Sequence, residues 1–217
     1  ETKSAVDRTP FHNEYVSERL EDTDDVRLLK SFTKGIGVYG SELRTMGFSG
    51  YLCELLVVHY GGFEEVIEAA SDWSPQVVID IESHARKEFD DPLVVIDPTD
   101  PERNVAAVLS RDNFARFIDA CRCLSEEPQR SLFYSSEPEP VSREDLKDYI
   151  EDRETTFVCV TFESPDVVED QLYPQLRKTE SSLVDELERR GFDVIRSEVA
   201  ADDRAAIILE LNIAEQS

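Results

Sequence analysis

The amino-acid sequence predicts an α+β fold in two parts, a helical part followed by a smaller part in which strands alternate with a helix. Three observations support this. Apolar residues recur at helical spacing over much of residues 24–123, a polar and proline-rich segment follows at 125–141, and strand-like runs come after it. We therefore expect an N-terminal extended segment at 1–22, a helical domain at 23–130 and a second domain at 142–217.

The helical domain is predicted from apolar stripes and their caps. A first helix begins near Asp24, and Ser49 and Ser110 stand where N-caps of two later helices are needed. Two short strand-like runs, 77–81 and 93–96, flank an acidic loop between these helices. The sequence thus places a small amount of strand within a mostly helical domain.

The second domain has a different pattern. Ser142 is placed to cap a short helix, and a strand at 155–162, a helix at about 167–190 and strands at 192–199 and 205–213 follow. The order β-α-β-β is the first two thirds of a ferredoxin-like β-α-β-β-α-β unit. We expect an incomplete ferredoxin-like domain, in a chain that also lacks a starting Met and reads as part of a longer protein.

The charge balance is extreme. The chain has 48 acidic and 23 basic residues, a net charge of −25, and only six of its basic residues are lysines. Acidic residues spread through folded-looking segments, together with few lysines, favour a protein adapted to high salt, where surface charges are strongly screened. The alternative is an acidic face for a basic partner.

The cysteines and the lengths of the apolar runs limit the cellular compartments in which the protein is expected. Cys53 and Cys159 sit in apolar runs, and Cys121 and Cys123 lack the second pair that a zinc site requires. Nothing in this pattern indicates disulfides, so we expect a reducing, cytoplasmic compartment. Apolar runs are far too short to cross a bilayer, and no membrane partner is expected.

No catalytic centre is recognisable in the sequence. Nucleotidyl transfer needs paired carboxylates for metal ions, and no Asp-x-Asp or Asp-x-Glu follows Gly40-Ser41 at the distance of about ten residues that such sites use. Asp80-Ile81-Glu82 has the spacing, but a solvated strand edge explains it better. His12, His59 and His84 are too dispersed to suggest a metal triad. We expect no catalytic and no metal-binding residues in this chain.

Two segments of the sequence, which we call the basic windows, are net positive although the whole chain is strongly acidic. Residues 26–61 and residues 103–123 each carry four basic and two acidic side chains, a net charge of +2. Since the whole chain carries −25, the two windows leave −29 for the rest. Basic residues that persist in such a chain are candidates for phosphate contacts. We favour a confined anion-binding site over an exposed helix face.

The residues themselves resemble a known family. The segments 26–70 (VRLLKSFTKGIGVYGSELRTMGFSG and onward), 94–118 (VVIDPTDPERNVAAVLSRDNFARFI) and 170–176 (DQLYPQL) resemble the archaeal class of CCA-adding enzymes. This resemblance implies a helical substrate-binding (neck) domain and a ferredoxin-like body domain. It further implies ATP and CTP as substrates, Mg²⁺ on a catalytic head that precedes residue 1, and the acceptor stem and 3′ end of tRNA as partner. It allows a homodimer.

The resemblance also assigns roles to particular residues. It implies that His12, Lys30 and Tyr39 contact the triphosphate of the incoming nucleotide, and that Arg103 reads the base edge together with tRNA phosphates. Ammonium, imidazole, hydroxyl and guanidinium groups suit these contacts. Lys30 could instead be a helix-surface charge, and Tyr39 a packing aromatic. Arg103 could instead form a structural ion pair with Asp97 or Asp100.

Four further positions complete the prediction. Asn104 is a second candidate for nucleotide binding, with a cap or turn role as its alternative. Lys34 and Arg44 are candidates for tRNA-backbone contacts. Met46 departs from the family pattern, in which a basic residue is expected, so any phosphate contact there is lost or comes from elsewhere.

Two other functions remain open at this stage. The first is an accessory domain of a poly(A) polymerase or an oligoadenylate synthetase, which would share the helical neck. The second is a non-enzymatic acidic adaptor that binds a basic protein. The adaptor predicts that windows 26–61 and 103–123 are unrelated in space.

The charge balance predicts stability that depends on salt. At low ionic strength the acidic side chains repel one another, so molar KCl should raise the melting temperature substantially. Thermal unfolding followed by circular dichroism between about 0.1 M and about 3 M KCl measures this. A melting temperature that stays flat or falls over this range would contradict adaptation to high salt.

Overall fold

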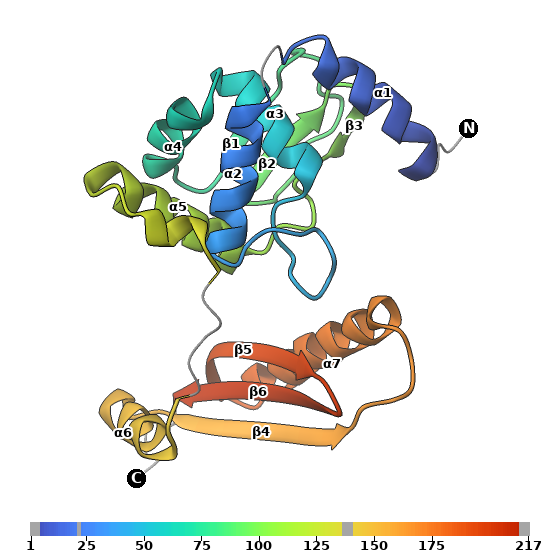
Figure 1. The fold of residues 1–217 in the computed structure, drawn as a ribbon. Helices are drawn as coiled ribbons and strands as arrows, with labels where there is room; N and C mark the ends of the chain where they lie inside the picture. Colours follow the sequence, from blue (N-terminus) through green and yellow to red (C-terminus); the bar gives the residue numbers. More distant parts are fainter. Residues whose placement is uncertain (1–4, 21–22, 136–140, 213–217) are drawn as a thin grey trace. The chain divides into compact units, whose positions relative to one another are not determined.

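The structure is a computed structural model that describes residues 5–20, 23–135 and 141–212. The chain divides into two units, Glu1–Glu137 and Pro138–Ser217, and each is described by itself (Figure 1). Across the described ranges, no helix combines the length and the apolar character that a membrane crossing requires.

The first unit consists of helices packed on a small sheet (Figure 1). Its sheet has the order β1-β2-β3, in which β1 and β2 are parallel and β2 and β3 form an antiparallel hairpin. The elements are α1 (Ala5–Ser17), α2 (Asp24–Gly35), α3 (Gly50–Tyr60), α4 (Phe63–Ser71), β1 (Val77–Ile79), β2 (Leu93–Asp97), β3 (Asp100–Asn104), α5 (Arg111–Glu126) and the 3-10 helix η1 (Arg130–Phe133).

The core of this unit is organised around Phe32 of α2. Its ring lies 6.1 Å from Phe63, 6.0 Å from Phe117 and 5.6 Å from Phe133, measured between ring centroids. Tilted and edge-on aromatic pairs at these separations add to the free energy gained by burying apolar surface. Because Phe133 belongs to η1, the packed unit extends beyond residue 130, where the sequence analysis ended the helical domain.

Two segments fold differently from the sequence analysis. Residues 1–22 were expected to be extended, but α1 occupies 5–17 despite a proline at position 10. Tertiary contacts stabilise this helix, since His12 bonds to Asp97 at the end of β2 and Tyr15 bonds to Glu82 in the turn after β1. The sequence predicts no strand at residues 100–104, but they pair with β2 as the strand β3. Neither segment has the apolar periodicity by which helices and strands are recognised.

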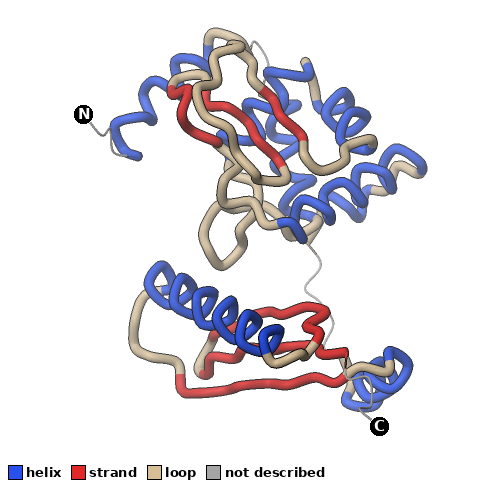
Figure 2. Tube along the Cα trace, turned by 180° about the vertical axis from the view of Figure 1, so that it is seen from behind, coloured by secondary structure: helices blue, strands red, loops and turns tan. Residues whose placement is uncertain are grey.

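The second unit contains α6 (Arg143–Arg153), β4 (Thr156–Glu163), α7 (Glu169–Arg189), β5 (Asp193–Ala201) and β6 (Arg204–Asn212). Its sheet has the order β4-β6-β5, so β6 lies between two strands joined through α7, and both pairings are antiparallel. One face of the sheet is covered by α7 (Figure 2). This split β-α-β arrangement confirms the predicted α+β fold class and the β-α-β-β order.

A buried carboxylate ties α6 to this sheet. Glu210 of β6 is only 1 % exposed, and it accepts hydrogen bonds from Arg153 Nε at 2.6 Å, from Thr155 Oγ1 at 2.7 Å and from Arg196. The hydrogen bond from Arg153, together with those from Thr155 and Arg196, outweighs the effect of burial and lowers the pKa of Glu210 from 4.5 to about 2. The end of α6 is therefore held to the sheet by charge.

The lowered pKa predicts a pH dependence for the second unit. The contribution of Glu210 to stability is present above pH 4.5 and is lost as the pH falls from 4.5 towards about 2. Glu210→Gln should be less stable than the wild type at neutral pH, and its melting temperature should fall less over this acidic range. Thermal unfolding at fixed salt measures both effects. Glu188→Gln, at an exposed position of α7, is the matched control and should keep the steep wild-type dependence.

Candidate functional site

The predicted site residues gather around the first turn of α3. This helix begins at Gly50, and the Ser49 hydroxyl accepts a hydrogen bond from Leu52 N at 3.1 Å, as expected for an N-cap. The amino end of a helix carries partial positive charge and backbone N–H groups that favour anions. Side chains from α1, α2 and the β2–β3 hairpin surround this turn.

Lys30 and Tyr39 lie together beside Gly50, the first residue of α3. A Cβ placed on Gly50 would be 3.3 Å from the Tyr39 hydroxyl and 3.5 Å from Lys30 Nζ, so both polar groups border this glycine. Lys30 Nζ pairs with Glu54 Oε1 at 2.7 Å, and Lys34 Nζ lies 4.8 Å from the centroid of the Tyr39 ring. The ammonium groups of Lys30 and Lys34 carry two positive charges and Glu54 carries one negative charge, so these side chains together with Tyr39 are net positive.

Tyr39 is held at the base of a closed loop. Residues 39 and 48 form an isolated bridge, and Phe48 N donates to Val38 O at 2.7 Å while Gly40 N donates to Phe48 O at 2.8 Å. The segment between them carries Arg44 at an exposed position. We refer to residues 40–47 as the α2–α3 loop. Its base fixes Tyr39, whereas its tip projects Arg44 towards solvent.

His12 and Arg103 share one acceptor, the carboxylate of Asp97. Oδ2 of Asp97 accepts from Arg103 Nη1 at 2.7 Å and lies 3.1 Å from His12 Nε2. Oδ1 accepts from Thr99 N at 2.9 Å and Thr99 Oγ1 at 2.8 Å, and from the Tyr51 hydroxyl at 3.3 Å. The side chain of Asp97 is 0 % exposed, whereas that of Arg103 is 35 % exposed.

The charge of Asp97 survives burial because of these contacts. Burial by itself would raise the pKa of this carboxyl group, but the hydrogen bonds from Thr99 N, Arg103 and Thr99 Oγ1 and the charge of His12 lower it below its ordinary value. Asp97 closes the fully buried strand β2, and Thr99 bonds back to it across the hairpin turn. The hairpin therefore presents a fixed negative charge to Arg103.

Tyr51 joins the two groups of residues. It directly follows Gly50, its ring stacks on His12 with centroids 4.0 Å apart and planes 11° from parallel, and its hydroxyl bonds to Asp97. Burial, together with the neighbouring Asp97, raises the pKa of Tyr51, so the hydroxyl stays protonated and donates. Lys30 and Tyr39 thus border Gly50, whereas His12 and, through Asp97, Arg103 are linked to the next residue, Tyr51.

Asn104 has a structural role, contrary to the expectation of a nucleotide contact. Its side chain is buried, its Oδ1 accepts from Val95 N and Ala106 N at 2.9 Å each, and its Nδ2 donates to Asp91 and to Leu93 O. These four bonds use the full capacity of an amide. The cap or turn role that the sequence analysis left open is the one that the structure supports.

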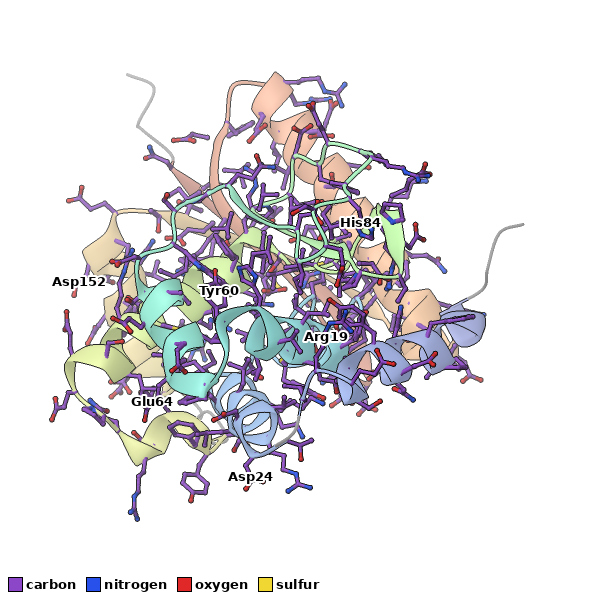
Figure 3. The ribbon with its side chains drawn as sticks, turned by 90° about the horizontal axis from the view of Figure 1, so that it is seen from above. Arg19, Asp24, Tyr60, Glu64, His84 and Asp152 are labelled. Atoms are coloured by element: carbon purple, nitrogen blue, oxygen red, sulfur yellow. The ribbon has the colours of Figure 1, made fainter. Side chains whose placement is uncertain are left out.

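The remaining sequence candidates have ordinary explanations. The strand β1 ends at Ile79, so Asp80 and Glu82 do not share a strand face. Asp80 instead accepts from Ala85 N at 2.7 Å, and Glu82 bonds to Tyr15 and to Arg19, which Figure 3 labels. Among the described residues, no group of three or more His, Cys, Asp or Glu side chains could hold a metal ion.

The sequence offers Asp97 only as an alternative ion-pair partner of Arg103, beside Asp100, and it does not single out Tyr51; the structure forms the pair with Asp97. Asp97 ends the run LVVID, and a carboxylate that directly follows four buried apolar residues is a signal that it needs cationic partners. His84, which Figure 3 labels, was also set aside, yet its Nε2 lies 3.2 Å from the Asp97 carbonyl oxygen. Two of the three dispersed histidines therefore converge on one residue.

The comparisons with known proteins agree with this geometry. The family described as tRNA nucleotidyltransferase, second domain, matches residues 24–134, which is half of the chain. The chain belongs to this family. The family described as CCA-adding enzyme, C-terminal domain, matches residues 153–217. Both matches favour the CCA-adding resemblance over an accessory domain of a poly(A) polymerase or oligoadenylate synthetase.

Individual relatives carry the same name. A CCA-adding enzyme of Halobacterium salinarum is 54% identical over 217 residues, which are 99% of this chain and 48% of the relative. One from Haloarcula marismortui is 55% identical over 94% of this chain and 44% of the relative, and one from Methanosarcina mazei is 48% identical over 96% and 46%. The chain thus spans about half the length of the curated relatives it matches.

The structural role of Asn104 predicts a loss of stability. Asn104→Ala leaves the N–H groups of Val95 and Ala106 without their acceptor inside the hairpin, which should cost on the order of 2–4 kcal/mol of unfolding free energy. Chemical denaturation at fixed KCl measures this cost. Asn13→Ala, at an exposed position of α1, is the control and should change stability by less than about 0.5 kcal/mol. A cost below about 1 kcal/mol for Asn104→Ala would contradict the structural role.

Proposed function

We propose that this chain is the nucleotide- and tRNA-binding portion of a CCA-adding tRNA nucleotidyltransferase, which builds or repairs the tRNA 3′-CCA end from CTP and ATP. One observation carries the proposal. Lys30 and Tyr39 border Gly50, and the next residue of α3 is Tyr51. The Tyr51 hydroxyl bonds to the Asp97 carboxylate, which also holds Arg103. A cationic triphosphate site and a base-reading guanidinium then lie within reach of one nucleotide.

The triphosphate end is assigned to the first turn of α3. Lys30, the Tyr39 hydroxyl and the amino end of the helix supply an ammonium group, a hydroxyl donor and backbone donors for phosphate oxygens. His12 approaches from α1 through its stack on Tyr51. Glu54 balances the charge of Lys30 until a phosphate arrives.

The base is assigned to Arg103 and the tRNA backbone to Lys34 and Arg44. Arg103 uses Nη1 on Asp97, and its partly exposed side chain retains further donors for a base edge or for phosphates. Lys34 lies beside Tyr39, and Arg44 lies on the α2–α3 loop, which suits contacts to a polymer rather than to one nucleotide. The adaptor alternative is disfavoured, because Tyr51 and Arg103 from the two basic windows meet at Asp97.

The setting of the protein follows from its composition. We place it in the cytoplasm of an organism that lives in high salt. Distributed acidity, few lysines and relatives from Halobacterium salinarum and Haloarcula marismortui support this placement. The free cysteines among the described residues fit a reducing compartment.

The metal chemistry is assigned to residues outside this chain. The described residues offer no group of carboxylates for paired Mg²⁺ ions, and the relatives are about twice as long. We therefore expect the 217 residues alone to add no nucleotide. Incubation with tRNA lacking CCA, Mg²⁺, CTP and ATP tests this expectation, and incorporation that depends on tRNA and exceeds a control without protein would overturn it.

The role of Arg103 gives the sharper test. In the complete protein, Arg103→Ala should lower kcat/KM for both CTP and ATP by roughly tenfold to a hundredfold, because a hydrogen bond from a charged group to the base is worth about 1.5–3 kcal/mol. Arg116→Ala, at an exposed position of α5 in the same basic window, is the matched control. Values for Arg103→Ala within about twofold of the wild type would mean that Arg103 does not read the base.

A further inference from the structure

The two oxygens of the Asp97 carboxylate have different partners. Oδ1 accepts hydrogen bonds from Thr99 and Tyr51, which fix the hairpin turn and the start of α3. Oδ2 faces Arg103 and His12, two residues that the proposed function assigns to opposite ends of the nucleotide. If Asp97 served only to stabilise the hairpin turn, the hydrogen bonds to Oδ1 would be sufficient.

The contact to Arg103 is made at one nitrogen. Nη1 lies 2.7 Å from Oδ2, and the side chain is 35 % exposed although its acceptor is wholly buried. A guanidinium held at one corner by a rigid charge keeps its other N–H donors for a ligand. Holding a long side chain in place before the ligand arrives reduces the loss of conformational freedom on binding.

We propose that Asp97 is a positioning residue that couples base recognition by Arg103 to triphosphate binding by His12. This inference rests on the proposed function and deepens it. The shared oxygen makes the two contacts interdependent, since an imidazole displaced from Oδ2 changes the acceptor that orients the guanidinium. The stack of His12 on Tyr51, itself bonded to the same carboxylate, restricts the alternatives open to the imidazole.

This coupling distinguishes a positioning role from a structural one. If Asp97 only supports the hairpin, its loss lowers stability and leaves the choice of nucleotide unchanged. If Asp97 couples the two contacts, base selectivity also depends on His12, a residue assigned to the triphosphate. Selectivity is the ratio of kcat/KM for CTP over UTP and for ATP over GTP.

The test uses the complete protein in molar KCl with tRNA lacking CCA. Asp97→Asn neutralises the shared acceptor, and His12→Ala removes one of its two partners on Oδ2. Thr99→Val is the matched structural control, because it removes a bond to Oδ1 and leaves the charge and Oδ2 in place. Lys30→Ala is the binding control, because Lys30 pairs with Glu54 and not with Asp97.

We expect Asp97→Asn and His12→Ala each to lower selectivity by about tenfold or more, whereas Thr99→Val and Lys30→Ala keep it within about twofold. Unchanged selectivity in Asp97→Asn, or an equal loss in Thr99→Val, overturns the inference. If Asp97→Asn does not fold, unchanged selectivity in His12→Ala overturns it equally. A wild-type protein that incorporates neither CTP nor ATP would instead refute the proposed function.

Discussion

A single buried carboxylate organises the candidate site. Asp97 is inaccessible to solvent, and an unpaired charge in that position would be strongly destabilising, so its partners are fixed by necessity. Those partners come from α1, α3 and the β2–β3 hairpin, which are distant in sequence. Satisfying one charge therefore brings together the residues that the proposed function needs.

The same principle recurs in the second unit. Glu210 is buried, and arginines from α6 and β5 hold it. In both units, a chain with 48 acidic residues buries a carboxylate against arginine rather than lysine. The planar guanidinium offers several donors and is less strongly hydrated than an ammonium group, which suits it to buried ion pairs. The predominance of arginine among the basic residues is consistent with this use.

The sequence predicted those parts of the fold that depend on local signals. Ser49, Ser110 and Ser142 cap helices as expected, and the β-α-β-β order of the second unit was recognised from its alternating patterns. It failed for α1 and β3, which lack apolar periodicity and depend on contacts made across the fold. Tertiary contacts override weak local preference in such segments.

The candidate site likewise contains residues that the sequence indicates and residues that only the fold brings together. The family resemblance predicts Lys30, Tyr39 and Arg103 as site residues. In the structure Lys30 and Tyr39 border Gly50, and Arg103 bonds to Asp97, which also bonds to Tyr51. The sequence indicates Asp97 only as an alternative ion-pair partner of Arg103, and it does not indicate Tyr51, because which groups converge on a buried carboxylate is a property of the fold and not of spacing. Asn104 was assigned wrongly for the same reason, since its four partners lie on neighbouring backbone and on Asp91.

The closed base of the α2–α3 loop has a consequence for how the family can vary. Backbone hydrogen bonds among Val38, Gly40, Gly47 and Phe48 seal the loop, so changes in length at its tip need not move the residues below it. Closing a somewhat longer loop costs little additional entropy. The carbonyl oxygens of Thr45 and Met46 accept hydrogen bonds from Ser110 N and Asn113, so the variable part is residues 41–44. These residues can be lengthened, shortened or recharged while the Tyr39 hydroxyl stays beside Gly50. Under the proposed function, contacts to RNA at the loop tip and contacts to the nucleotide below it can therefore change separately.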